Sequence, residues 1–148
     1  MDAYVVIGNP NTRKSSLVRS LTGSFNRSIR DILPLGAKSA VRIYARVGSL
    51  QDTKTRPDDF LAEVERTRCS AVLCCLLPSE HPNFPALYPD AQTYLARFRA
   101  GGWRVRAIAV LGQNGGDVRS PNLRQFPQAP TAPINVTAHA VRLHFGWE

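Results

Sequence analysis

A short run near the start of the chain has the residue types and spacing of a phosphate-binding loop. Residues 8–15 read Gly-Asn-Pro-Asn-Thr-Arg-Lys-Ser and match the pattern G-x-x-x-x-G-K-[ST], except that Arg13 replaces the second glycine. In such a loop successive backbone N–H groups, with the positive end of the following helix, wrap an anionic phosphate. Lys14 is then expected to reach the β- and γ-phosphates, and Ser15 to offer its hydroxyl to Mg²⁺. The candidate binding residues here are Gly8, Asn11, Thr12, Arg13, Lys14, Ser15 and Ser16, with Ser15 also the candidate metal ligand.

The arginine at position 13 leaves two interpretations open. If this position needs a positive φ, a residue with a Cβ costs about 1 kcal/mol or more. The guanidinium of Arg13 would either add positive charge beside the phosphates or fill the loop and exclude the nucleotide. A chance strand–loop–helix with a capping serine is disfavoured, because the motif lies where a predicted strand meets a predicted helix.

Apolar runs that alternate with amphipathic segments predict the elements that position this loop. Residues 4–8 form an apolar run ending at a glycine, which is typical of a buried strand, and residues 14–23 have a helical pattern. Further strands are expected at 30–35, 40–48, 70–78, 105–112 and 134–145, with a short helix left open at the end of the last one, and further helices from Pro57 onward and over 89–102. Residues 112–133 are rich in Gly, Pro and Asn and predict a long loop, with at most a short helix.

Strands that alternate with helices indicate an α/β fold. We expect a three-layer, P-loop NTPase-like fold with a mainly parallel central sheet of five or six strands, forming a single domain over residues 1–148. Ligands of such folds bind beyond the carboxyl ends of the strands. The loops of interest therefore follow Ile7, Val47, Leu77, Leu111 and Val136.

The segment 8–23, GNPNTRKSSLVRSLTG, resembles the first motif of the translation-factor-like GTPases, G-x-P-N-x-G-K-S-[ST]-L-x-N-x-L-T-G. The match extends beyond the phosphate loop to Leu17, Leu21 and the helix end at Thr22 and Gly23. The order of the expected elements along the chain is also similar to that of the family. The resemblance implies GTP or GDP as the nucleotide, with ATP as the alternative, and Mg²⁺ as the metal.

The segment aligned with the family's D-x-x-G motif implies weak or absent hydrolysis. Residues 45–48 read Ala-Arg-Val-Gly and lack the carboxylate that helps to hold magnesium in the family. Asp52 lies nearby as a substitute, although an ordinary loop acid is the simpler interpretation. No Gln or His follows Gly48 at the position that orients the attacking water, and Gln51 is displaced from it. An active enzyme would need an acid elsewhere, such as Asp52 or Glu80.

The family's base-reading motif N-K-x-D has a partial counterpart. Asn114 and Asp117 keep the Asn and Asp spacing, and the carboxylate would accept hydrogen bonds from guanine. The lysine is missing, and Asn-Gly-Gly-Asp is also the composition of a plain turn. Residues 136–139, Val-Thr-Ala-His, weakly resemble the last family motif, and the chain then ends without room for the family's closing helix.

Composition limits the classes of partner. The chain has 148 residues, of which 43% are hydrophobic, and this suits one globular domain. No apolar run approaches the roughly 20 residues that span a bilayer, and the start MDAYVVIG lacks the basic region of a secretory signal, so we expect a cytoplasmic protein without membrane contact. The net charge of +8 makes nucleic acid a candidate partner, although the arginines are scattered along the sequence.

Three functions follow from these patterns. The first is a nucleotide-binding switch or scaffold of GTPase-like ancestry, with guanine weakly preferred over adenine. The second is an active small NTPase or phosphotransferase. The third is a module that keeps the fold, no longer binds nucleotide, and recognises a protein or nucleic acid.

Overall fold

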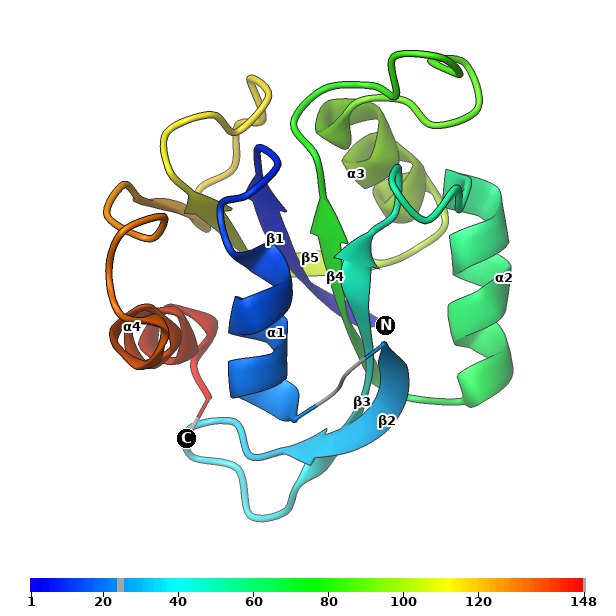
Figure 1. The fold of residues 1–148 in the computed structure, drawn as a ribbon. Coiled ribbons are helices and arrows are strands. Elements are labelled where there is room, and N and C mark those ends of the chain that lie inside the picture. The colour runs from blue at the N-terminus through cyan, green and yellow to red at the C-terminus, as the bar shows by residue number, and fades with distance from the viewer. Residues whose placement is uncertain (24–25, 148) are drawn as a thin grey trace.

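The computed structural model describes residues 1–23 and 26–147, which form a six-stranded sheet with helices on both faces (Figure 1). The strands are β1 (Asp2–Gly8), β2 (Arg27–Ile32), β3 (Val41–Ser49), β4 (Ala71–Leu76), β5 (Arg104–Leu111) and β6 (Leu123–Phe126). The helices are α1 (Lys14–Thr22), α2 (Pro57–Thr67), α3 (Ala91–Ala100) and α4 (Ile134–Phe145). The expectation of an α/β fold with a mainly parallel sheet is confirmed at this level.

The strands lie in the order β2-β3-β4-β1-β5-β6, and among the described strands the β2–β3 pair is antiparallel and the other pairs are parallel. Strand β4 therefore lies between β3 and β1.

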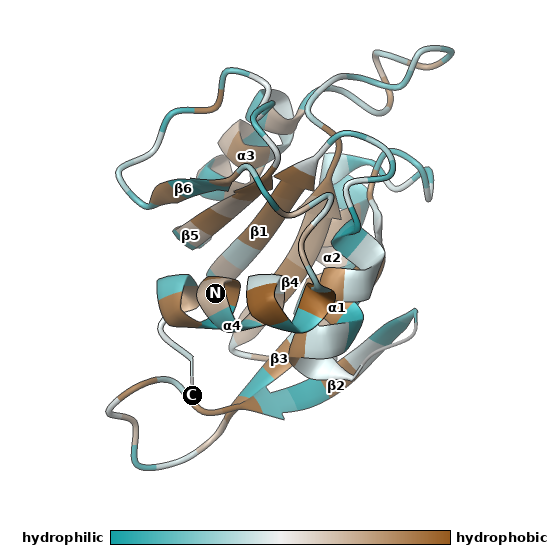
Figure 2. Cartoon of the chain, turned by 60° about the vertical axis from the view of Figure 1, so that its left-hand side comes forward, coloured by the Kyte–Doolittle hydropathy of each residue, from teal (hydrophilic) through white to brown (hydrophobic). Residues whose placement is uncertain are grey.

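Apolar side chains fill the space on each side of the sheet. Figure 2 shows that hydrophobic residues, coloured brown, are concentrated on the central strands. Helices α1 and α4 pack on one face, and α2 and α3 pack on the other. All six residues of β4 are buried, as the uninterrupted apolar run predicts for a strand covered on both faces. The layers hold the carboxyl ends of the parallel strands, and the loops that follow them, at one end of the molecule.

Local sequence signals account for where α2 and α3 begin. Pro57 occupies the first turn of α2, where its missing N–H costs nothing, and two acids follow it near the positive helix end. The Asp90 carboxylate caps α3 by accepting a hydrogen bond from the backbone N–H of Thr93 at 2.9 Å.

The end of the chain corrects two expectations. Residues 134–145, predicted as a last strand with a short helix left open at its end, form helix α4 over their whole length, and the last strand is instead β6, inside the segment predicted as a long loop. Thr137, Ala138, Val141 and Phe145 are buried and lie on one side of α4 at helical spacing. The chain therefore has a closing helix, contrary to the expectation that there is no room for one.

Candidate nucleotide-phosphate site

The turn between β1 and α1 contains two residues with a left-handed backbone. Arg13 has φ 72° and ψ 30°, which is the left-handed region, and Asn11 is also left-handed with φ 65°. Position 13 thus takes the conformation for which the usual pattern has glycine. A Cβ on Gly8 would lie 2.3 Å from the Thr12 hydroxyl oxygen, so the loop also needs a glycine where it leaves the strand.

The backbone N–H groups at the start of α1 are free to bind an anion. In the described part of the chain, the N–H groups of residues 11–16 donate no hydrogen bond, and the first helical bond runs from Leu17 to the Arg13 carbonyl at 3.0 Å. Arg13 is the N-cap residue and makes no side-chain cap. Because unpaired N–H groups at a helix start carry partial positive charge, this turn favours a negative ligand.

The ammonium group of Lys14 is held inside the loop. Its Nζ donates to the carbonyls of Gly8 and Asn9, both at 2.8 Å, and only 8% of the residue is exposed. Burial lowers the pKa of Lys14, and the negative charges of Cys75 and Asp52 in their ionised forms oppose this shift. A lysine ammonium has three donors, so one is left for a ligand beyond the two carbonyls.

The Arg13 guanidinium is bound to a segment outside the loop, although Arg13 also lines the space over the loop. Its Nη1 donates to the carbonyl of Ala132 at 2.6 Å, in the segment between β6 and α4. Of the two interpretations of Arg13, a plug across the loop has no support from this contact. The side chain instead ties the phosphate loop to the residues that precede α4.

A hollow of about 340 Å³ lies over the phosphate loop and brings together residues from two elements. Lys14 and Ser15 line it from one side, and Asp52 lines it from the loop after β3. The Ser49 hydroxyl donates to the Asp52 carboxylate at 2.6 Å and fixes its direction. Hydroxyl and carboxylate oxygens are ligands that suit Mg²⁺, with the nucleotide phosphates as further ligands. No group of three or more His, Cys, Asp or Glu side chains gathers as a metal site within residues 1–23 and 26–147.

Gln51 has a structural role rather than a place beside the phosphate loop. It is fully buried, and its amide nitrogen donates to the carbonyls of Leu77 and Pro89 at 2.9 and 3.1 Å. Its amide oxygen accepts from the N–H of Leu77 at 2.9 Å. These bonds join the loop after β3 to the loop after β4 and leave Gln51 unable to orient a water. Glu80 is exposed on that second loop and does not line the hollow.

The two candidate base-contacting residues lie in different surroundings. Asn114 donates to the side-chain oxygen of Asn9 at 3.1 Å and so braces the phosphate loop. Asp117, with φ 61°, lies in a separate hollow beside Gln92 and Arg99 of α3. The structure therefore brings Asn114, but not Asp117, next to the phosphate loop.

The segment that resembles the last family motif is not a loop. Residues 136–139 belong to α4, where the N–H groups of Val136 and Thr137 donate to the Pro133 carbonyl. Those N–H groups are used by the helix and are not available to a base. The loop that actually follows the last strand is residues 127–133, which includes the Ala132 carbonyl bound by Arg13.

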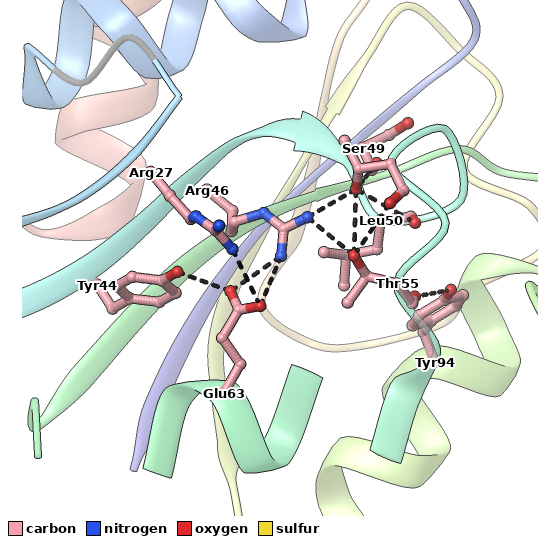
Figure 3. Close-up of polar contacts among 9 residues, drawn as sticks. Arg27, Tyr44, Arg46, Ser49, Leu50, Thr55, Glu63 and Tyr94 are labelled. Carbon is pink, nitrogen blue, oxygen red and sulfur yellow. Dashed lines mark hydrogen bonds and ion pairs between the residues drawn. The ribbon is translucent and has the colours of Figure 1, made fainter. Parts of the chain in front are cut away.

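Sequence reasoning missed a partly buried polar network next to the site, drawn in Figure 3. Arg46 of β3 donates to both carboxylate oxygens of Glu63 in α2, at 3.1 and 2.9 Å, and its other terminal nitrogen donates to the hydroxyls of Thr53 and Thr55 at 2.8 Å. Tyr44 donates to the same carboxylate at 2.6 Å. Burial and the neighbouring Glu63 raise the pKa of Tyr44 to about 12.

This network fixes the loop that carries Asp52. The Thr53 hydroxyl also donates to the carbonyl of Ser49, and Tyr94 of α3 donates to the carbonyl of Thr55 at 2.6 Å. Residues 49–56 are thereby held to β3, α2 and α3. The signal available from the sequence was a charged residue, Arg46, within an otherwise apolar strand pattern.

Comparison with known proteins gives no match: no family model, no curated protein and no solved structure is significantly similar to the chain. None of the described helices is both long and apolar enough to cross a bilayer. The functional assignment therefore depends on the geometry of the phosphate loop and its surroundings.

Proposed function

We propose that the chain is a nucleotide-binding P-loop protein that holds the phosphates of GTP, GDP or ATP with Mg²⁺ and acts as a switch or scaffold. The observation that carries this proposal is the turn at residues 8–16, with a left-handed residue at position 13, unpaired backbone N–H groups and a lysine held inside. A phosphate with several oxygens is the anion that such a set of donors accommodates. Ser15 and Asp52 would hold Mg²⁺ from the two sides of the hollow.

Hydrolysis is proposed to be slow or absent, because neither Gln51 nor Glu80, the described side chains considered for orienting a water, is placed to do so at the phosphate loop. Gln51 is committed to backbone groups of two other loops, and Glu80 lies outside the hollow. Turnover needs an in-line water as well as a bound metal. A protein that binds nucleotide and releases it unchanged fits a switch or scaffold better than a catalyst.

Isothermal titration with GDP, GTP and ATP, with and without Mg²⁺, tests this function. We expect saturable binding, and in Lys14→Ala a loss of roughly 10-fold to 100-fold in affinity, since a charge-assisted hydrogen bond contributes about 1.5–3 kcal/mol. Lys38→Ala is the matched control because Lys38 is exposed on the distant hairpin between β2 and β3. A folded Lys14→Ala protein with wild-type affinity would refute the proposed site.

An active NTPase or phosphotransferase is the second candidate, favoured by the presence of Asp52 beside Lys14 and Ser15. Phosphate release from GTP or ATP in the presence of Mg²⁺ separates it from the first. Measurable turnover that Asp52→Asn abolishes would support the enzyme and overturn the proposal of a non-hydrolysing protein.

A further inference from the structure

The end of the molecule opposite the phosphate loop carries a group of exposed arginines. Strands β3, β4, β1 and β5 are parallel neighbours, so their amino ends lie along one edge of the sheet. Helices α2 and α3 run back against these strands, and their carboxyl ends reach the same edge (Figure 1). Six arginines, here called the basic edge, are exposed there: Arg42, Arg66, Arg68, Arg99, Arg104 and Arg106.

Backbone hydrogen bonds show that the starts of β3, β4, β1 and β5 lie side by side across the sheet. Ser70 donates to the carbonyl of Arg42, Asp2 donates to the carbonyl of Ser70, and Arg104 donates to the carbonyl of Met1. Arg42 and Arg104 are thus three strand spacings apart, or roughly 14 Å. At a rise of about 3.4 Å per nucleotide, this distance corresponds to about four nucleotides of one strand.

The guanidinium groups of the basic edge are largely unpaired. Within the described residues, Arg104 makes the only ion pair of the six, a 3.6 Å contact with Asp2 in which its own side chain is 75% exposed. At the start of α2, by contrast, Arg56 and Arg97 are paired with the carboxylates of Asp59 and Asp58. The arginines of the basic edge therefore keep most of their hydrogen-bonding capacity for a ligand.

Arginines outnumber carboxylates at the end of the molecule that carries the basic edge. The described carboxylates near these arginines are Asp2, Glu65, Asp31, which lies opposite Arg42 in the β2–β3 register, and Asp117, which lines the same hollow as Arg99. Six guanidinium groups against four carboxylates leave a positive surface, and Arg bonds phosphate oxygens bidentately where Lys acts as a point charge. Part of the chain's net charge of +8 is therefore concentrated at this end of the molecule.

We propose that the basic edge binds the phosphodiester backbone of a nucleic acid, at a site separate from the phosphate loop. A membrane surface fits less well, because the large exposed hydrophobic side chains of the described chain lie on β2, α4 and two loops and none on α2, α3 or β3–β5. Contacts to backbone phosphates carry no sequence information, so this binding is non-specific in sequence and strongly dependent on salt.

Fluorescence anisotropy with short labelled single-stranded RNA, single-stranded DNA and duplex DNA, from about 50 to about 200 mM KCl, tests the proposal. We expect binding at low salt with a linear fall of log K against log [KCl]. The triple variant R42Q/R68Q/R106Q should bind at least 10-fold more weakly at low salt and lower the slope by about two, since each single-strand phosphate contact contributes about 0.7. Comparison of the three probes shows whether RNA, DNA or both are bound.

The matched control is K54Q/R56Q/R124Q, which removes the same charge from exposed positions outside the basic edge. We expect it to retain near wild-type binding, and the single variant Lys14→Ala to retain it too, so that failure of the nucleotide site does not affect this test. Absence of binding at low salt, equal weakening by the control, or binding to phosphatidylserine vesicles without binding to nucleic acid would each overturn the proposal.

Discussion

Arg13 offers the sharpest test of the phosphate-loop geometry, because its backbone and its side chain have opposite effects on stability. Its left-handed backbone, with φ 72°, costs about 1 kcal/mol for any residue that has a Cβ. Its guanidinium donates to the Ala132 carbonyl at 2.6 Å, a partly buried bond that contributes about 1–1.5 kcal/mol. Substitution of this residue by alanine and by glycine separates the backbone cost from the contribution of the hydrogen bond.

Arg13→Ala keeps the Cβ and removes the bond, so the free energy of unfolding should fall by about 1–1.5 kcal/mol. Arg13→Gly removes the bond but also removes the cost of the left-handed backbone, so the free energy of unfolding should fall by no more than about 0.5 kcal/mol. We therefore expect the glycine variant to be the more stable of the two by about 1 kcal/mol. For a domain of this size that difference corresponds to roughly 3 °C in Tm.

Urea unfolding monitored by tryptophan fluorescence measures both variants against the wild type. If the glycine variant is no more stable than the alanine variant, position 13 is not left-handed. The loop conformation described above would then be wrong. Nucleotide titration of the same proteins gives a second result. Because the guanidinium bonds Ala132, neither substitution should weaken nucleotide binding as much as Lys14→Ala does.

Two further predictions concern the polar network between β3 and α2. Arg46→Ala leaves the Glu63 carboxylate, 19% exposed, without its main cation, so urea unfolding should show a loss of about 3 kcal/mol, and the double variant R46M/E63Q should recover part of it; a loss below about 1 kcal/mol would contradict the contact. The pKa of Tyr44 is raised from 10.0 to about 12, so the folded state keeps this proton where the unfolded state has lost it. Stability should therefore fall as the pH rises from 10 to 12, and this fall should be shallower in Tyr44→Phe; an identical pH profile for that variant would show that Tyr44 is not coupled to folding.

The largest error of sequence reasoning was the segment 134–145. Its β-branched and aromatic residues favour a strand, and short apolar segments do not distinguish strand from helix by periodicity alone. The segment folds as helix α4 because its buried side, with Val141 and Phe145, completes the core beside α1. That choice depends on a partner surface more than 100 residues away in the sequence, which no local pattern contains.

The sequence by itself determined the local elements whose signals are carried by neighbouring residues. The strand–loop–helix at residues 2–22, the proline and acids that begin α2, and the aspartate cap of α3 all follow from such signals. Each reflects the interaction of a side chain with backbone a few residues away, and so it can be predicted from a window of sequence.

Tertiary structure alone decided which distant groups meet. It placed β4 between β3 and β1, turned Arg13 toward Ala132, brought Asp52 over the phosphate loop and buried Gln51 between two other loops. It also gathered arginines that are scattered in the sequence along one edge of the sheet. These outcomes depend on strand pairing and on packing of both faces of the sheet, which are properties of the whole chain rather than of any short segment.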